Sequence, residues 1–229
     1  MIKVIAFDFG NVTYKLDNKF FISGLLKYSS LGYTRLHREI LNSSDYKLFE
    51  TGKISFDEYF GRTKKRIKLS VRKEIFIKLF NNRFTEIEST YNLIKRLHLK
   101  YILLLCSNTN DINFSQVIKK SRAFKFFYGS VTSFKVGYLK PRSAVYLEVI
   151  RIADYEPEEI LFIDDKKINI NGARKLGIRA IQYKSYRSLI NDLLKYKIKV
   201  WQKLFKLINE VLWYVKITNM HLCGPCWSW

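Results

Sequence analysis

Only three of the 229 residues are cysteines: Cys106, Cys223 and Cys226. Three thiols are too few for the disulfide framework that holds small secreted domains together. The chain also lacks an uninterrupted apolar run long enough to cross a bilayer, and its N-terminal apolar stretch is too short for a secretory signal. From these absences we expect a cytoplasmic protein without a transmembrane segment.

Acidic residues are scarce as well. The sequence has 20 Asp and Glu residues against 41 Lys and Arg residues, which gives a formal net charge of +21. Such a charge can attract nucleic acid, anionic lipid or a phosphorylated small molecule. The lysines are scattered along the chain and no nucleic-acid-binding motif accompanies them, so we interpret most of them as surface composition. We therefore expect no nucleic-acid partner, and we expect the positive field to speed encounters with anionic substrates.

Short apolar runs alternate with stretches of helical periodicity over most of the chain. The predicted strands are residues 3–9, 101–106, 127–132, 160–163 and 178–183. The predicted helices between them are residues 87–99, 111–119, 143–153 and 169–176. This alternation predicts an α/β fold built on a doubly wound parallel sheet.

Residues 16–83 break the alternation, because their pattern is helical and contains no convincing strand. The segment directly follows the first strand, so we interpret it as a small helical cap that folds over the strand ends. The alternative is that these helices simply cover one face of the sheet. The predicted catalytic core is then formed by residues 1–15 and 84–196.

Residues 197–229 differ again in character, because apolar residues at helical spacing alternate with lysines and predict a basic amphipathic helix. Such a helix most often packs on its own domain or on a sister subunit, so self-association is one expectation. A membrane surface or another partner is the alternative. The terminal pair Cys223 and Cys226 lacks the strand–helix context of a redox motif and the further ligands of a zinc site, so we interpret it as incidental.

Three of the five predicted strands end in polar side chains. Asp8 ends the first, Ser107 and Asn108 follow the second, and Asp164 and Asp165 end the fourth. Ligands of open α/β sheets bind beyond the carboxyl ends of the strands, so these groups are expected to form one site. The adjacent carboxylates Asp164 and Asp165 would repel one another unless a cation lies between them.

Four motifs in this order resemble those of the haloacid dehalogenase superfamily, and the resemblance covers about residues 2–195. They are Asp-Phe-Gly-Asn-Val at 8–12, Ser-Asn-Thr-Asn at 107–110, Gly-Tyr-Leu-Lys-Pro at 137–141, and Phe-Ile-Asp-Asp at 162–165 followed by Asn-Ile-Asn-Gly-Ala at 169–173. Within the superfamily the sequence is most similar to bacterial sugar-phosphate phosphatases of the α-D-glucose-1-phosphate phosphatase type. The C-terminal stretch is not part of this resemblance.

The resemblance implies a Mg²⁺-dependent phosphatase acting on a small phosphorylated metabolite, with Asp8 as the nucleophile. It implies that Lys140, Ser107 and the main-chain N–H of Asn108 bind the phosphoryl oxygens, and that Asn169 orients the loop of the fourth motif. The implied metal site contains the carboxylates of Asp8 and Asp165, the carbonyl of Gly10 and, beside them, Asp164. The cap would choose the substrate, and its candidate pocket residues are Tyr46, Phe49, Glu50 and Tyr59.

One departure from the family pattern concerns position 10. Most phosphatases of the superfamily carry a second Asp there as general acid and base, whereas this chain has Gly10. The glucose-1-phosphate phosphatase type shares this absence, and an anomeric hydroxyl is acidic enough to leave with less help. Two alternatives remain open: a metal-independent 2-haloacid dehalogenase, which also lacks the second Asp, and a catalytically weak paralogue that acts as a binding protein.

Overall fold

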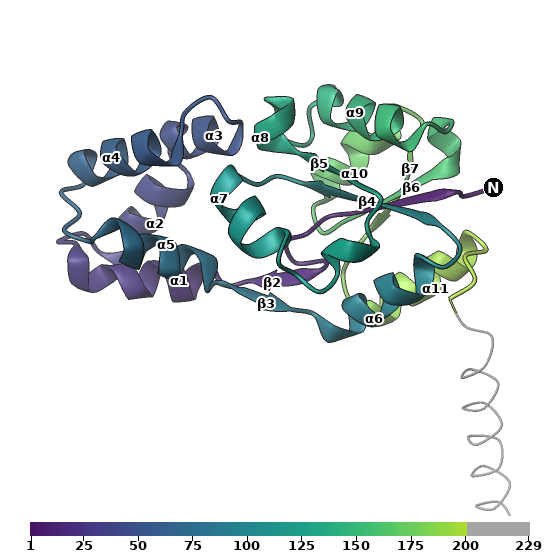
Figure 1. Cartoon of the computed structure of the whole chain (residues 1–229), viewed down its shortest axis with the longest axis horizontal. Helices are drawn as coiled ribbons and strands as arrows, with labels where there is room; N and C mark the ends of the chain where they lie inside the picture. The colour runs from purple at the N-terminus through teal and green to yellow at the C-terminus, as the bar shows by residue number, and fades with distance from the viewer. Residues whose placement is uncertain (201–229) are drawn as a thin grey trace, which may run out of the picture.

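The computed structural model describes residues 1–200 (Figure 1). The predicted amphipathic segment and the pair Cys223 and Cys226 therefore lie outside the described residues, except for residues 197–200. The centre of the structure is a five-stranded parallel sheet, which confirms the predicted fold class. In spatial order its strands are β5 (Gly129–Thr132), β4 (Ile102–Ser107), β1 (Val4–Phe7), β6 (Ile160–Asp164) and β7 (Arg179–Gln182).

The sheet is buried on both faces, as apolar strands without alternation require. On one face Ile5 and Phe7 pack against α6 (Glu88–Leu97) and α11 (Tyr186–Lys195). On the other face Val4 and Ala6 pack against α9 (Ser143–Ala153) and α10 (Lys167–Arg174). Figure 1 shows these helix pairs above and below the sheet. Because successive side chains of a strand point to opposite faces, one strand of four residues contributes to both apolar layers.

The remaining core elements are short. The predicted helix over 111–119 is a single turn, α7 (Asp111–Asn113), that continues as a π-helical turn over Phe114–Ile118. The short helix α8 (Ser133–Val136) follows β5. Single 3₁₀ turns cover Leu26–Tyr28, Phe124–Phe126 and Pro157–Glu159.

The helices of the inserted segment form a separate unit with its own apolar core (Figure 1). They are α1 (Asn18–Leu25), α2 (Tyr33–Leu41), α3 (Ser44–Glu50), α4 (Phe56–Arg66) and α5 (Lys73–Asn81). Phe49 and Tyr59 stack on one another inside this core, with ring centroids 4.9 Å apart, and are 1% and 0% exposed. The expectation that these two aromatic rings line a substrate pocket was therefore wrong, because they hold the helices of the unit together.

A two-stranded antiparallel ribbon joins this unit to the sheet. It pairs β2 (Tyr14–Leu16) with β3 (Phe84–Glu86), and the main-chain N–H of Asp17 donates to the carbonyl of Arg83 at 2.7 Å. Neither strand was predicted, since three residues are too few to establish a period-2 pattern. We propose that the helical unit is the cap over residues 16–83, and we call it the cap below.

The cap approaches the core closely between the turn after α3 and the start of α8. Ser133 Oγ lies 2.6 Å from the carbonyl oxygen of Glu50. Gly52 adopts φ +67°, and a Cβ placed on it would lie 2.2 Å from the carbonyl oxygen of Phe134. Any side chain at position 52 would therefore separate the two parts.

Gly52→Ala is expected to lower the melting temperature by roughly 4–8 °C, because a positive φ costs about 1–2 kcal/mol for a residue with a Cβ and the Phe134 clash adds to this. Thermal unfolding followed by circular dichroism measures the effect. The matched control is Gly61→Ala inside α4, where the new methyl group meets no atom within 4 Å and stability should rise slightly. An unchanged melting temperature for Gly52→Ala would contradict the described contact.

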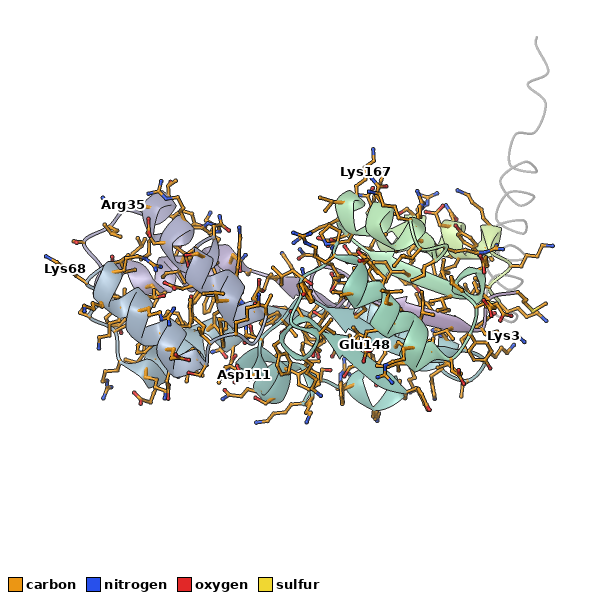
Figure 2. All side chains as sticks on the ribbon, turned by 90° about the horizontal axis from the view of Figure 1, so that it is seen from above. Lys3, Arg35, Lys68, Asp111, Glu148 and Lys167 are labelled. Carbon is orange, nitrogen blue, oxygen red and sulfur yellow. The ribbon has the colours of Figure 1, made fainter. Side chains whose placement is uncertain are left out.

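Basic side chains project from both parts of the protein. Figure 2 shows Arg35 and Lys68 on the cap and Lys3 and Lys167 on the core, and all four are exposed. Within residues 1–200 no helix is long and apolar enough to cross a membrane.

Candidate active site

Asp8 and Asp164 are brought together by the register of neighbouring strands. Phe7 of β1 pairs with Ile163 of β6, so the residues that follow them are also side by side at the carboxyl end of the sheet. The main-chain N–H of Asp8 donates to the carbonyl of Ile163 at 2.9 Å, which continues the ladder to the site. Both carboxylates are buried.

Lys140 is the cation of this cluster. It lies in the loop between α8 and α9 and is 5% exposed. Its Nζ donates to Asp164 Oδ2 at 2.7 Å and to the carbonyl of Cys106 at 2.8 Å, and it lies 3.0 Å from Asp8 Oδ1. Burial of the ammonium group opposes its charge, but the carboxylates of Asp8 and Asp164 prevail and raise the pKa of Lys140 above its usual value. Lys140 therefore stays protonated.

Asp164 is fully enclosed by donors. Besides Lys140, the main-chain N–H of Lys166 donates to Oδ1 at 2.8 Å, and Asn169 Nδ2 contacts both carboxylate oxygens at 2.9 and 3.0 Å. Burial alone would raise the pKa of Asp164, but these donors lower it below the usual value. Asp164 thus remains a carboxylate whose oxygens are already bonded, and it positions Lys140.

Asp8 is held differently. Its Oδ1 accepts from the main-chain N–H of Phe9 at 2.7 Å and faces Lys140, whereas Oδ2 carries neither of these contacts. Burial is the main reason that the pKa of Asp8 rises to about 7, and the neighbouring carboxylates Asp164 and Asp165 add to the increase against the opposing effect of Lys140. The charge of Asp8 is therefore not fully compensated by the protein alone.

The carboxylates of Asp8, Asp164 and Asp165 form one cluster, with an oxygen of each within 4.8 Å of the others. Lys140 pairs with only two of these three acids, so the donor set suits a divalent cation, and hard oxygen ligands are those that Mg²⁺ prefers. Asp165 is the most accessible of the three, and Asn11 Nδ2 donates to its Oδ2 at 3.2 Å. Gly10 belongs to the same turn as Asn11 and lies directly after the strand that carries Asp8.

The Ser107–Asn108 segment ends β4, next to β1. The side chain of Asn108 forms a reciprocal pair with the main chain of Lys140: Lys140 N donates to Oδ1 at 2.8 Å, and Nδ2 donates to the Lys140 carbonyl at 3.3 Å. The side chain of Asn108 thus aligns the second and third motifs. Ser107 is buried beside it, and its Oγ makes only a long contact of 3.4 Å to the Asn108 carbonyl.

The Lys140 loop is pressed against α10. The Tyr146 hydroxyl donates to the carbonyl of Asn169 at 2.7 Å, and a Cβ on Gly172 would lie 2.9 Å from both Pro141 and the Tyr146 ring. A glycine is required at position 172 because helix and loop approach so closely. This packing fixes the loop that carries Lys140 relative to the helix that carries Asn169.

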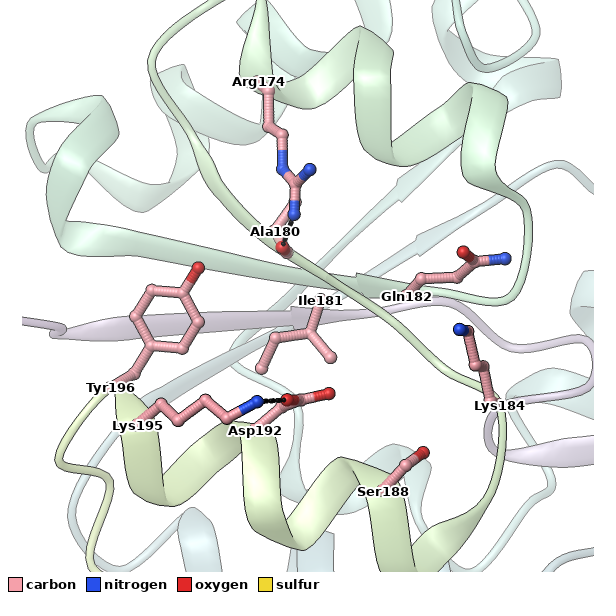
Figure 3. Close-up of a pocket in the computed structure, with 9 residues that line it drawn as sticks. All are labelled: Arg174, Ala180, Ile181, Gln182, Lys184, Ser188, Asp192, Lys195 and Tyr196. Carbon is pink, nitrogen blue, oxygen red and sulfur yellow. Dashed lines mark hydrogen bonds and ion pairs between the residues drawn. The ribbon is translucent and has the colours of Figure 1, made fainter.

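Two cavities differ in what surrounds them. One of about 430 Å³ lies between the cap and the carboxyl ends of the strands, with Asn108 and Lys166 on its core side. Another of about 410 Å³ lies beside the edge strand β7, as Figure 3 shows. Its acidic residue Asp192 is paired with Lys195 at 2.7 Å, and its lining includes none of the predicted site residues. The cavity under the cap is therefore the one that belongs to the candidate site.

Sequence reasoning assigned no role to two residues that the structure brings to this site. Asn11, with φ 58°, contacts Asp165, and its place in the first motif was the available signal. Arg83 lines the cavity under the cap and is 3% exposed. No pattern in the sequence distinguished this arginine from the other basic residues near it.

Similar proteins were found by sequence and by structure. The curated D-ribitol-5-phosphate phosphatase of Bacteroides thetaiotaomicron is 24% identical over 193 residues, which cover 80% of this chain and 92% of that protein. A haloacid dehalogenase family enzyme of the same organism, solved with magnesium and inorganic phosphate, has a TM-score of 0.72 and 26% identity over 80% of this chain and 95% of that one. A hydrolase of this type from Porphyromonas gingivalis has a TM-score of 0.73 and 24% identity over 85% and 98% of the two chains.

A family model described as haloacid dehalogenase-like hydrolase matches residues 33–183. That match spans well over half of the chain and includes the second, third and fourth motifs. The protein therefore belongs to the haloacid dehalogenase-like hydrolases.

Proposed function

We propose that this protein is a Mg²⁺-dependent phosphatase that hydrolyses a small phosphomonoester, a sugar or polyol phosphate, through an aspartyl-phosphate on Asp8. The observation that carries the proposal is the buried contact of Lys140 with both Asp8 and Asp164, beside the more accessible Asp165. The two relatives from Bacteroides thetaiotaomicron support it, because one is a ribitol-5-phosphate phosphatase and the other binds magnesium and phosphate.

In this proposal the Asp8 carboxylate attacks phosphorus, with Lys140 beside it at 3.0 Å from Oδ1. A carboxylate nucleophile divides the reaction into phosphoryl transfer to the enzyme and transfer to water. Lys140, Ser107 and the N–H of Asn108 bind the phosphoryl oxygens as charge shifts in the transition state. Asp8, Asp165 and the Gly10 carbonyl would hold Mg²⁺, with Asp164 beside them. The bound ion supplies positive charge against the phosphoryl oxygens and the acid cluster.

The lack of a carboxyl group at Gly10 affects which phosphate esters the protein can hydrolyse fastest. A side chain that protonates the leaving oxygen typically contributes ~10²–10⁴ in rate, and this chain carries none at that position. Esters whose alcohol is relatively acidic need this help least. Sugar 1-phosphates are therefore expected to react faster than sugar 6-phosphates.

The test is release of inorganic phosphate from glucose 1-phosphate, glucose 6-phosphate and ribitol 5-phosphate, with Mg²⁺ or with a chelator. Mg²⁺-dependent release from any of these esters supports the proposal. Chloride release from 2-chloropropionate without metal, and no phosphate release, would instead identify the dehalogenase alternative. The absence of both activities would favour the alternative of a catalytically weak paralogue that acts as a binding protein.

The stabilisation of the protein by Mg²⁺ is expected to grow with pH. Because burial raises the pKa of Asp8 from 3.8 to about 7, the metal-free folded state holds a proton there that the unfolded state has lost. Stability without metal should thus fall as pH rises from about 4 to 7, and Mg²⁺ must displace this proton to bind. Thermal unfolding with Mg²⁺ and with chelator should show a larger shift in melting temperature at pH 8 than at pH 5.5. Equal shifts at both pH values, or a full shift in Asp165→Asn, would contradict this expectation.

A further inference from the structure

The cavity under the cap adjoins the proposed phosphate site but is built mainly from cap residues. Tyr46, Glu50 and Arg83 line it from the cap side, and Asn108 and Lys166 line it from the core side. At about 430 Å³ it has room for a small metabolite. With its phosphoryl group near Ser107 and Lys140, a bound ester would extend its alcohol portion into this cavity.

Arg83 is held in place by neighbouring side chains. Its Nη1 donates to Asn18 at 2.9 Å and its Nη2 to Asn113 at 3.1 Å, while the guanidinium lies 4.0 Å from the centroid of the Phe80 ring. Arg83 is thus held between an aromatic face and two amide oxygens. It contributes a fixed positive charge to the cavity wall.

Glu50 is the one carboxylate among the described residues that line this cavity. Burial raises the pKa of Glu50, against the opposing effects of nearby Arg83, Tyr46 and Lys166. The oxygens of this carboxyl group can each accept hydrogen bonds, and they belong to a side chain that lines the cavity.

The main chain of Glu50 fixes its position relative to the proposed phosphate-binding loop. Its carbonyl oxygen lies 2.6 Å from Ser133 Oγ, and that hydroxyl accepts from the main-chain N–H of Thr109 at 2.9 Å. Thr109 belongs to the loop that carries Ser107 and Asn108. A single hydroxyl group thus links the residue at the cavity wall to the loop proposed to bind phosphate.

We propose that Glu50 is a specificity-determining residue, which accepts hydrogen bonds from hydroxyl groups of a polyol or sugar monophosphate beside Tyr46, a residue that lines the same cavity. The inference rests on the proposed phosphatase activity. A hydroxylated alcohol portion supplies the donors that the Glu50 carboxylate requires. An alkyl group would cover this acceptor without giving it a partner.

The experiment compares kcat and KM with Mg²⁺ for the wild type, Glu50→Gln, Tyr46→Phe and the control Glu74→Gln, which changes an exposed glutamate on α5 of the same cap. The substrates are ribitol 5-phosphate and glucose 6-phosphate, which carry hydroxyl groups, and butyl phosphate and p-nitrophenyl phosphate, whose alcohol portions do not. Thermal unfolding checks that each variant is folded.

The wild type should favour the hydroxylated esters over butyl phosphate by about 10²-fold or more in kcat/KM. Glu50→Gln should lose about 10- to 100-fold for the hydroxylated esters, mainly through KM, and keep its activity on the other two. Tyr46→Phe should show a smaller loss with the same substrate dependence, which keeps the test valid if Glu50→Gln does not fold. Equal losses on all four substrates, or no loss on any, would overturn the role of Glu50. If the wild type is inactive on every ester, the result would instead contradict the proposed phosphatase activity.

Discussion

Asp8→Asn is expected to reduce Mg²⁺-dependent phosphate release by roughly 10⁴-fold or more, because an amide cannot attack phosphorus and no phosphoenzyme forms. The other carboxylates cannot replace Asp8. Asp164 accepts hydrogen bonds on both oxygens, from Lys140, Lys166 and Asn169. Asp165 follows the adjacent strand and is bonded to Asn11. Initial rates at saturating Mg²⁺, together with the trapping of a phosphorylated enzyme from labelled substrate, measure the loss.

A folding defect can be separated from this loss of chemistry. Ionised Asp8 is destabilised by its burial, so at pH 8 without metal the neutral amide of the Asp8→Asn variant should leave the melting temperature unchanged or raise it. The control is Asp154→Asn, an exposed residue at the end of α9 with φ 54°, a conformation that asparagine tolerates. This control should keep full activity. Appreciable turnover by folded Asp8→Asn would exclude Asp8 as the nucleophile.

Gly10→Asp is expected to increase turnover of esters with poor leaving groups by up to ~10²-fold, because it supplies the carboxyl group that can protonate the leaving oxygen. The local structure permits the change, since a Cβ on Gly10 meets no atom within 4 Å and its φ lies outside the left-handed region. Glucose 6-phosphate and butyl phosphate should gain most, whereas glucose 1-phosphate should change little. The measurement is kcat for each ester at saturating Mg²⁺, so that the added negative charge does not limit metal binding.

The matched variant is Gly10→Asn, which has nearly the same shape and cannot donate a proton in this way. An equal change in both variants would show that shape and not acidity is responsible. A loss on all substrates in Gly10→Asp alone would mean that the extra carboxylate disturbs the cluster of Asp8, Asp164 and Asp165.

The core of the fold was predictable because its signals are local. Val4–Phe7 and Ile160–Asp164 are uninterrupted buried runs. Asp8 follows the first and Asp164 ends the second, and the parallel register then brings these acids together. The cap was recognised as helical, but its pocket was not resolved. Phe49 and Glu50 are neighbours on α3, and only the packed helices decide that the ring enters the cap core while the carboxylate lines the cavity.

Contacts between distant residues were beyond the reach of sequence patterns. Arg83 takes its partners from positions 18 and 113, and its selection among 41 basic residues depends on where the cap and α7 meet. The β2–β3 ribbon escaped prediction for a related reason. Each strand has three residues, and the paired residues are about 70 positions apart in the chain. Such a pairing produces no local sequence pattern.

The ribbon also has a consequence for how this protein could have diversified. The chain leaves the core at Asp17 and returns at Arg83, where the two main chains are joined by a hydrogen bond of 2.7 Å. A segment whose ends meet in this way can be lengthened, shortened or exchanged without altering the register of the five-stranded sheet, because loop-closure entropy changes only slowly with length. Substitutions within residues 17–83 can therefore change which leaving group the protein accepts, while the acids at the strand ends remain in place. The same reactive residues can in this way be combined with different caps.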